Sequence, residues 1–388
     1  MKENGFKILI FQRILTHYRE GIFRELYQKI GALICYGKNG PPGTYLTKAK
    51  PDFPHCEIFD FYPYPKKDTL VIQNIFFPLF RFKPRIIIME LAVANLSNWL
   101  LFLFRIFFHY KLIVWTHGYN RKFGLNPEKY LRDKLRIWFM NQSDAVIIYS
   151  KNNKKVVAPY IKCQDKLFVA QNTLDTRILT SIRDELDKLG KERIKKEVGF
   201  EKKYNLIFIG RVLQEKEPDR LIQVFRLIAD KVDSIQLHIV GDGPLLDHIK
   251  KMASGLEVKF WGNITDDYEA GRLLFVSDLM VMPGYLGLSI MHAFAFDKPV
   301  VSQIKGKNGP FHSPEIEYVI SGKTGFLIPY GDNEKMAEVI IHYLNDARLQ
   351  ETMKNEVRKM LKNCSIEKMI EGFKDAINYV NKGLANDS

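Results

Sequence analysis

Cysteine is scarce in this chain of 388 residues. Its few cysteines are too far apart to form the paired spacing of a zinc site and too few to suggest a disulfide framework; they are Cys35, Cys56, Cys163 and Cys364. The absence of both patterns fits a reducing compartment, and we expect a cytoplasmic protein.

A long hydrophobic run is also absent. The most apolar stretch, residues 96–108, falls short of the roughly 20 residues that a membrane-spanning helix needs, and Arg105 lies inside it. The first residues lead directly into an apolar segment that is too short for the core of a signal peptide. A buried helix accounts for residues 96–108. Their four phenylalanines and one tryptophan, beside a basic surface, leave docking at a membrane interface as the alternative.

Acidic residues are few in the first half of the chain. Residues 1–175 contain 27 lysines and arginines but only 13 aspartates and glutamates, whereas the remainder contains 31 of each kind. The whole net charge of +14 therefore lies in the first half. This asymmetry favours an anionic partner, such as lipid headgroups or a phosphorylated acceptor, over a surface that only keeps the protein soluble. Nucleic acid is not expected, because the chain has no zinc-finger spacing, RNA-recognition octapeptide or basic heptad region.

Short apolar runs alternate with amphipathic stretches along the chain, a pattern typical of parallel α/β sheets. In the first half we expect strands at 7–11, 85–89, 112–115, 145–149 and 167–170. In the second half we expect them at 206–209, 236–240, 258–261, 279–282, 299–302 and 326–328. The length allows two domains. We predict two Rossmann-like domains facing a common cleft, with these bounds: 1–175, a linker at 176–203, 204–364, and a final helix at 365–388 that packs back on the first domain.

The segment that begins at Asn205 carries the clearest chemical signal. It reads as a buried strand that ends at Gly210 and is followed by Arg211 and Lys216. Ligands of open α/β sheets bind beyond the carboxyl ends of the strands, so these two cations are placed to hold a diphosphate. The spacing is not that of a Walker loop, because neither a second glycine before Lys216 nor a following Ser or Thr is present. A structural ion pair is the alternative.

Two further strands end at glycines. Gly241 and Gly243 follow the strand at 236–240 and allow the main chain to approach a ligand closely, although a purely structural turn would need them too. Trp261 and Gly262 end the strand at 258–261, where a flat base could lie against main-chain amides.

The sequence around residue 287 predicts an anion site. A strand turns through glycines into a helix that starts near Leu288, so the amides of Gly287, Leu288 and Ser289 would point at a ligand. His292 would lie about one turn into this helix, as a ligand contact or as a packed residue. Glu315 lies in a later loop, where it could accept hydrogen bonds from vicinal hydroxyls or could simply favour the start of a helix.

This ordered set of motifs resembles the retaining nucleotide-sugar glycosyltransferases of family four, which have the GT-B fold. The resemblance is strongest over residues 205–327 and extends to most of the chain. It implies that Arg211 and Lys216 bind the donor diphosphate, that His117 in the Trp-Thr-His-Gly loop contacts the donor sugar, and that Glu315 contacts its hydroxyls. In the first domain, the resemblance is carried by the run that begins at Leu15, and we expect acceptor contacts from His17, Tyr18 and Arg19.

The chain departs from that family at two points. The family often has a Glu-x7-Glu pattern whose positions are Gly284 and His292 here, and it usually has Gly where this chain has Asp297. A branch of the family carries histidine at the second position, so these changes fit a subgroup.

The resemblance implies transfer of a sugar from a nucleotide-diphosphate sugar to a hydroxyl acceptor with retention of configuration. No metal or other cofactor is expected, because the cations and amides would stabilise the leaving group and no Asp-x-Asp loop is present. The basic first domain suggests a lipid-linked saccharide acceptor, as in polysaccharide biosynthesis, and a peripheral position at the inner face of the membrane. Two alternatives are a catalytically inactive sugar-nucleotide-binding partner of a glycan-assembly complex and a sugar-nucleotide epimerase of the same fold.

Overall fold

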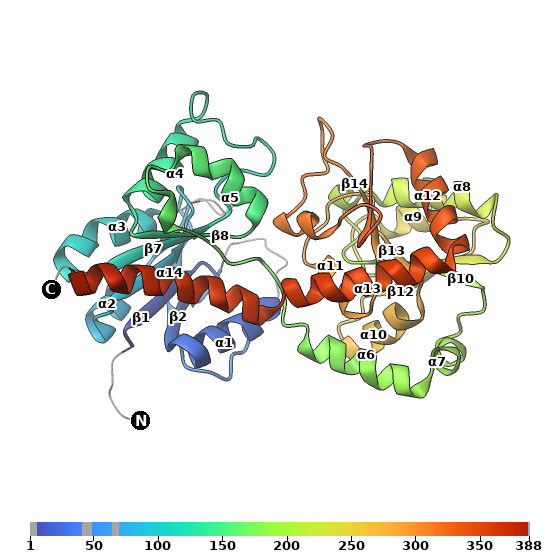
Figure 1. The fold of residues 1–388 in the computed structure, drawn as a ribbon, viewed down its shortest axis with the longest axis horizontal. Helices are drawn as coiled ribbons and strands as arrows, with labels where there is room; N and C mark the ends of the chain where they lie inside the picture. The colour runs from blue at the N-terminus through green and yellow to red at the C-terminus, as the bar shows by residue number, and fades with distance from the viewer. Residues whose placement is uncertain (1–5, 41–48, 64–69, 387–388) are drawn as a thin grey trace. The chain divides into compact units, whose positions relative to one another are not determined.

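The computed structural model describes residues 6–40, 49–63 and 70–386 (Figure 1). The chain divides into two compact units. The N-terminal unit consists of residues 1–175 and 366–388, and the C-terminal unit consists of residues 176–365. The chain thus leaves the first unit, forms the whole of the second, and returns in its last helix.

A seven-stranded parallel sheet forms the centre of the N-terminal unit. Its order is β3 (His55–Ile58), β2 (Ala32–Gly37), β1 (Ile8–Gln12), β6 (Ile86–Glu90), β7 (Lys111–Thr116), β8 (Ala145–Ile148) and β9 (Leu167–Val169). The helices are α1 (Glu20–Ile30), α2 (Phe76–Phe82), α3 (Leu96–Phe108), α4 (Leu131–Gln142), α5 (Lys151–Val157) and α14 (Ile366–Asn386), and β4 (Asp60–Phe61) pairs with β5 (Ile72–Gln73). Strand order reverses between β1 and β6, which is the place where open sheets of this kind bind ligands.

Alternation of side chains along each strand gives this sheet a core on each face. In β1, Ile10 belongs to the core shared with α1 and α14, whereas Leu9 and Phe11 belong to the core beneath α2, α3 and α4. The final helix is tightly seated, because Phe373 of α14 meets the ring of Trp115 edge-on at 5.0 Å. A side chain at Gly372 would lie 2.2 Å from the Val169 carbonyl oxygen, so α14 runs directly over β9.

A six-stranded parallel sheet forms the centre of the C-terminal unit. Its order is β12 (Val258–Gly262), β11 (Ile235–Val240), β10 (Tyr204–Ile209), β13 (Leu279–Val281), β14 (Val300–Gln303) and β15 (Gly325–Ile328). Its helices are α6 (Arg177–Leu189), α7 (Lys191–Glu197), α8 (Pro218–Ala229), α9 (Leu246–Met252), α10 (Asp267–Val276), α11 (Ser289–Ala295), α12 (Asn333–Asn345) and α13 (Ala347–Asn363). Here the order reverses between β10 and β13, which places the loops after these strands at the expected ligand edge.

Every strand that the sequence predicts is present, with its ends shifted by a residue or two. The first sheet also contains β2 and β3, which were not among the predicted strands. The segment 176–203, expected as a charged helical linker, does form two helices, α6 and α7. They pack against α10 and belong to the C-terminal unit.

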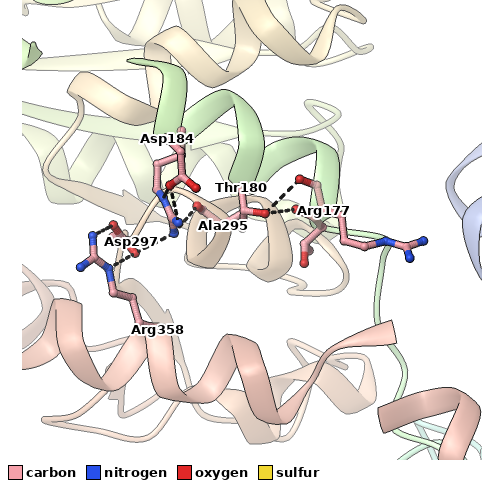
Figure 2. A network of polar contacts seen from close by, with 8 residues as sticks. Arg177, Thr180, Asp184, Ala295, Asp297 and Arg358 are labelled. Carbon is pink, nitrogen blue, oxygen red and sulfur yellow. Dashed lines mark hydrogen bonds and ion pairs between the residues drawn. The ribbon is translucent and has the colours of Figure 1, made fainter. Parts of the chain in front are cut away.

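An ion-pair network ties α6 to the rest of the C-terminal unit (Figure 2). Asp297 follows α11 and adopts a left-handed conformation, with φ of 62°, which glycine adopts most readily. Its carboxylate accepts two hydrogen bonds from Arg358 of α13, at 2.8 and 2.7 Å. Arg183 of α6 donates a third, at 3.3 Å, and also contacts Asp184 and the carbonyl of Ala295. The departure from the usual glycine therefore provides an anion that joins three helices.

Asp297→Asn is expected to lower the free energy of unfolding by about 2 kcal/mol, because it removes a mostly buried anion from two arginines. Asparagine has the same size and also adopts the left-handed backbone conformation. Urea denaturation measures the loss. Asp184→Asn is the matched control, since the Asp184 side chain is 63% exposed and, among the residues that the structure describes, pairs with Arg183 alone. A loss in the control as large as that in Asp297→Asn would contradict the role given to this network.

Candidate functional site

The carboxyl ends of β10 and β11 meet through glycines. The amide of Gly210 donates to the carbonyl of Val240, and the amide of Val212 donates to the carbonyl of Asp242. A side chain at Gly241 would lie 1.9 Å from the Gly210 carbonyl oxygen, and one at Gly243 would lie 2.4 Å from the Val212 carbonyl oxygen. The packing of the two loops therefore requires both glycines, and their contact with a donor stays a prediction.

Lys216 lies at the end of the loop that begins with Arg211. Its ammonium donates to the carbonyl oxygen of Tyr285 at 2.7 Å and lies 4.5 Å from the centre of the Tyr285 ring. Only 8% of Lys216 is exposed, and this burial lowers its pKa to about 8, although Glu215 and Glu315 act to raise it. Arg211, by contrast, is an exposed side chain at the mouth of the same loop. The two cations share one loop at the ligand edge of the sheet.

Gly284 explains the first departure from the family pattern. Its amide donates to the carbonyl of Lys216, and the next amide, of Tyr285, donates to the carbonyl of Glu215. A side chain at position 284 would lie 2.2 Å from the carbonyl carbon of Lys216. The chain after β13 is thus docked directly on the loop that carries Lys216, so this backbone arrangement has no room for a glutamate at position 284.

His312 makes a hydrogen bond to the segment that follows β13. Its Nδ1 accepts from the amide of Leu286 at 3.1 Å, and its Nε2 is 2.8 Å from the carbonyl oxygen of Gln303, to which it donates. Burial lowers the pKa of His312 to about 4, so the neutral ring makes both bonds at neutral pH. A hydrogen bond of 2.6 Å between the hydroxyls of Tyr285 and Ser313 adds a second tie.

Sequence reasoning did not identify His312 as a site residue. The available signal was its place in the loop after β14. Its partners become visible only in the fold.

Glu315 lies in a short 3-10 helix, Pro314–Tyr318, and is completely buried. Its position in the first turn agrees with the structural interpretation, but its charge also acts on Lys216 and raises the pKa of that lysine. A carboxylate and an ammonium therefore lie near each other beside the docked Gly284 segment. Such a pair can accept hydrogen bonds from sugar hydroxyls and neutralise a phosphate.

The predicted anion site at residues 287–289 precedes α11, which has seven residues with Leu288 as its N-cap. The hydroxyl of Ser289 is buried and has no hydrogen-bond partner among the residues that the structure describes. His292 is half-buried on this helix. The binding roles of Gly287, Leu288, Ser289 and His292 stay predictions.

Trp261 makes a hydrogen bond to His238 within the C-terminal unit. Its indole nitrogen donates to Nδ1 of His238 at 3.3 Å, and Lys259 lies 4.1 Å from its ring centre. His238 in turn stacks on Phe200 at 3.6 Å. This side chain is thus part of an aromatic cluster beside β11. The neighbouring Gly262 does lie beside the site, since its carbonyl accepts from the amide of Gly241.

In the N-terminal unit, His117 and Arg19 meet around Tyr149. The His117 ring stacks on the Tyr149 ring at 4.2 Å, and its Nδ1 is buried without a hydrogen-bond partner among the described residues. Burial and nearby arginines, including Arg19, lower the pKa of His117 to about 3. The Arg19 guanidinium contacts Gln12 and the Tyr149 hydroxyl, both at 3.3 Å, and lies 5.1 Å from the Trp115 ring centre.

The other two predicted acceptor residues lie next to Arg19. His17 is exposed, and its ring meets that of the half-buried Tyr18 edge-on at 5.7 Å. Arg19 and His117 thus gather at the carboxyl ends of β1, β7 and β8, with His17 at the outer margin.

Among the described residues, we find no group of three or more His, Cys, Asp or Glu side chains that could hold a metal ion. Nor does that part of the chain contain a helix that combines the length and hydrophobicity of a membrane span.

Comparison with known proteins shows what these features are similar to. Residues 190–360 match the family described as "Glycosyl transferases group 1". The C-terminal unit is thus similar to the group 1 glycosyltransferases. The chain is 26% identical over 341 residues to an uncharacterized glycosyltransferase of Methanocaldococcus jannaschii. This match covers 76% of this chain and 79% of that protein. The chain is 29% identical over 170 residues to the sulfoquinovosyl transferase SQD2 of Arabidopsis thaliana, a match that spans 43% of this chain but only 32% of the plant protein.

Solved structures show that this chain has the GT-B fold. The Anabaena protein Alr3699/HepE, solved in complex with UDP, superposes with a TM-score of 0.68 over 96% of this chain and 99% of its own, at 16% identity. A glycosyltransferase from Rickettsia africae superposes with a TM-score of 0.69 over 97% and 98%, at 18% identity. These similarities confirm the fold that the sequence predicts.

Proposed function

We propose that this protein is a glycosyltransferase that transfers a sugar from a nucleoside-diphosphate sugar to a hydroxyl group of its acceptor. The observation that carries the proposal is the placement of Lys216 and Arg211 on the loop after β10, with Lys216 near the buried Glu315. The Anabaena relative in fold was solved with UDP, which supports a nucleoside diphosphate as the group held there.

The chemistry follows from the charge of the leaving group. As the bond between the anomeric carbon and the phosphate oxygen breaks, negative charge grows on the diphosphate, and Lys216 and Arg211 neutralise it. The acceptor oxygen forms the new bond on the same face of the sugar, and its proton passes to the departing phosphate. This route retains the anomeric configuration and needs neither a dedicated protein base nor a metal. The amides of Gly287, Leu288 and Ser289 would assist the same charge.

The sugar itself needs neutral or anionic hydrogen-bonding partners. Glu315 accepts from its hydroxyls in this proposal. His117 suits a second sugar contact because its depressed pKa keeps the ring neutral at physiological pH. His292 would contact the donor from α11.

Glu315→Gln is expected to lower kcat/KM for the donor by about 10²-fold, because the amide keeps the shape but loses the charge that the hydroxyls and Lys216 sense. The Lys216 pKa should also fall, since Glu315 raises it, and the alkaline fall in activity should move to lower pH. Steady-state rates between pH 6 and 10 test both effects. Glu317→Gln, in the same turn, is the control. An unchanged pH profile in Glu315→Gln would contradict the coupling.

The acceptor is proposed to be a lipid-linked saccharide of a cell-surface glycan, made at the cytoplasmic face of the membrane. The basic composition of residues 1–175 supports this, because such acceptors carry phosphate and lie among anionic headgroups. In this proposal, Arg19, His17 and Tyr18 would contact such an acceptor.

The direct test is mass spectrometry of purified protein with a panel of nucleoside-diphosphate sugars and a lipid-diphosphate saccharide. The proposal expects an acceptor that is heavier by one sugar, with release of nucleoside diphosphate. Epimerised nucleotide sugar without transfer would indicate an epimerase. Donor binding without turnover over the whole panel would indicate an inactive binding partner.

A further inference from the structure

The N-terminal unit exposes a row of large apolar side chains on α2 and α3. Phe77 and Phe80 on α2 are 55% and 64% exposed, and Leu103, Ile106 and Phe107 on α3 are 51%, 64% and 69% exposed. We call these five side chains the apolar face. Figure 1 shows the two helices on the N-terminal unit. Singly exposed apolar residues are common, but a contiguous group usually marks an interaction site.

The two helices that carry the apolar face pack against each other through aromatic rings. Ring pairs join the two helices edge-on, with Phe76 of α2 5.0 Å from Phe104 and Phe80 5.1 Å from Phe108. The opposite side of α3 is buried through Leu101. Asn95 caps the start of this helix, because its side chain accepts from the amide of Ser97. The outward side chains therefore stay outward because the inward positions of both helices are already filled.

Positive charge lies at one end of the apolar face. Arg81 and Lys83 are exposed at the end of α2, whereas Arg105 of α3 is half-buried and donates to the carbonyl of Gln142. Between residues 70 and 111 the chain has five arginines and lysines, and Glu90 is the sole acidic residue. The face is thus apolar, with exposed basic residues at the end of α2.

We propose that this face docks on the surface of an anionic lipid bilayer. Helix α3 has 13 residues and is about 20 Å long, which is too short to cross a hydrocarbon core of about 30 Å but suits a helix that lies in the interface. Outward aromatic and aliphatic side chains enter the boundary between headgroups and acyl chains, and Arg81 and Lys83 contact lipid phosphates. A symmetric dimer through this face is disfavoured, because it would bring Arg81 and Lys83 of two copies near one another.

This inference is independent of the proposed reaction, since vesicle binding needs no donor. Flotation of the full chain with two kinds of vesicle tests it. One kind is phosphatidylcholine alone, and the other contains about 30% phosphatidylglycerol, which gives a roughly physiological anionic charge. We expect binding to the anionic vesicles at low salt and a weakening of at least about 10-fold at high salt, because surface charge is screened. Equal binding to both vesicle types, or no binding to either, overturns the proposal.

Two variants assign the binding to this face. Phe77→Ser/Phe80→Ser/Phe107→Ser and Arg81→Glu/Lys83→Glu should each weaken binding at least about 10-fold. The controls are Ile178→Ser/Ile320→Ser and Lys250→Glu/Lys251→Glu, which change exposed residues of the C-terminal unit and should bind like the wild type. Hydrogen exchange should slow in α2 and α3 when anionic vesicles are added. Wild-type binding in both face variants overturns the proposal. So does a concentration-dependent dimer that the triple variant abolishes, because the face would then belong to a second copy.

Discussion

Lys216→Met is expected to lower the turnover of sugar transfer by about 10²-fold or more, the usual effect of losing one preorganised group that stabilises a leaving anion. Methionine keeps the length and the packing over Tyr285 but removes the charge. Arg211→Ala should lower turnover to a similar degree for the same reason. Initial rates with saturating donor measure both effects.

The lysine also makes a pH signature. Because burial lowers the Lys216 pKa to about 8, the ammonium loses its proton as the pH rises through that value, and donor binding should weaken there. The profile of kcat/KM should therefore fall on its alkaline side near pH 8, and Lys216→Met should lose this limb. Lys250→Ala, an exposed lysine of the same unit, should keep both the rate and the profile. A wild-type rate in Lys216→Met would remove the lysine from the mechanism.

Gly284→Glu, which restores the carboxylate typical of the family, is expected to inactivate the protein. The new side chain would start 2.2 Å from the carbonyl carbon of Lys216, and backbone cannot move aside as cheaply as a flexible side chain. The docked segment must then separate from the loop that carries Lys216. We expect a fall in kcat/KM of at least about 10²-fold and a loss of about 1–3 kcal/mol in the free energy of unfolding.

Gly284→Ala should show most of this loss, because the first side-chain carbon already makes the clash. Gly383→Ala in α14 is the matched control, since a side chain there meets nothing within 4 Å. Activity and thermal unfolding measured on the three variants separate the clash from a general effect of replacing glycine. A fully active Gly284→Glu would show that the loops are not docked as described.

Much of the fold could be predicted because parallel strands that are buried on both faces appear as short continuous apolar runs. Strand β2 directly follows a helix, because one residue, Gly31 in a left-handed conformation, separates it from Ile30 at the end of α1. Strand β3 was missed because it lies at the sheet edge and alternates exposed and buried residues over four positions. Where apolar runs are short or adjoin a helix, periodicity alone does not separate the elements.

The site divides in the same way. Lys216 could be predicted as a site residue because a cation that follows a strand and a glycine is a local pattern in the sequence. His312 was not predicted as a site residue. Its role depends on hydrogen bonds to the main chain of Leu286 and Gln303, which only the fold brings to its ring. Asp297 likewise has partners that are distant in the sequence, because Arg183 lies on α6 and Arg358 lies on α13. Non-local contacts of this kind leave no spacing pattern to read.

The central claim is that Lys216 and Arg211 hold the departing diphosphate. Isothermal titration of nucleoside diphosphates at pH 7 and pH 9, each in two buffers of different ionisation enthalpy, tests it most directly. At pH 9 Lys216 is largely neutral when free, because its pKa is about 8, so binding of the anion should take up a proton. The account predicts this uptake in the wild type, its absence in Lys216→Met, and at least about 10-fold weaker binding in Lys216→Met and Arg211→Ala. Equal affinity in all three proteins, without proton uptake, would contradict it.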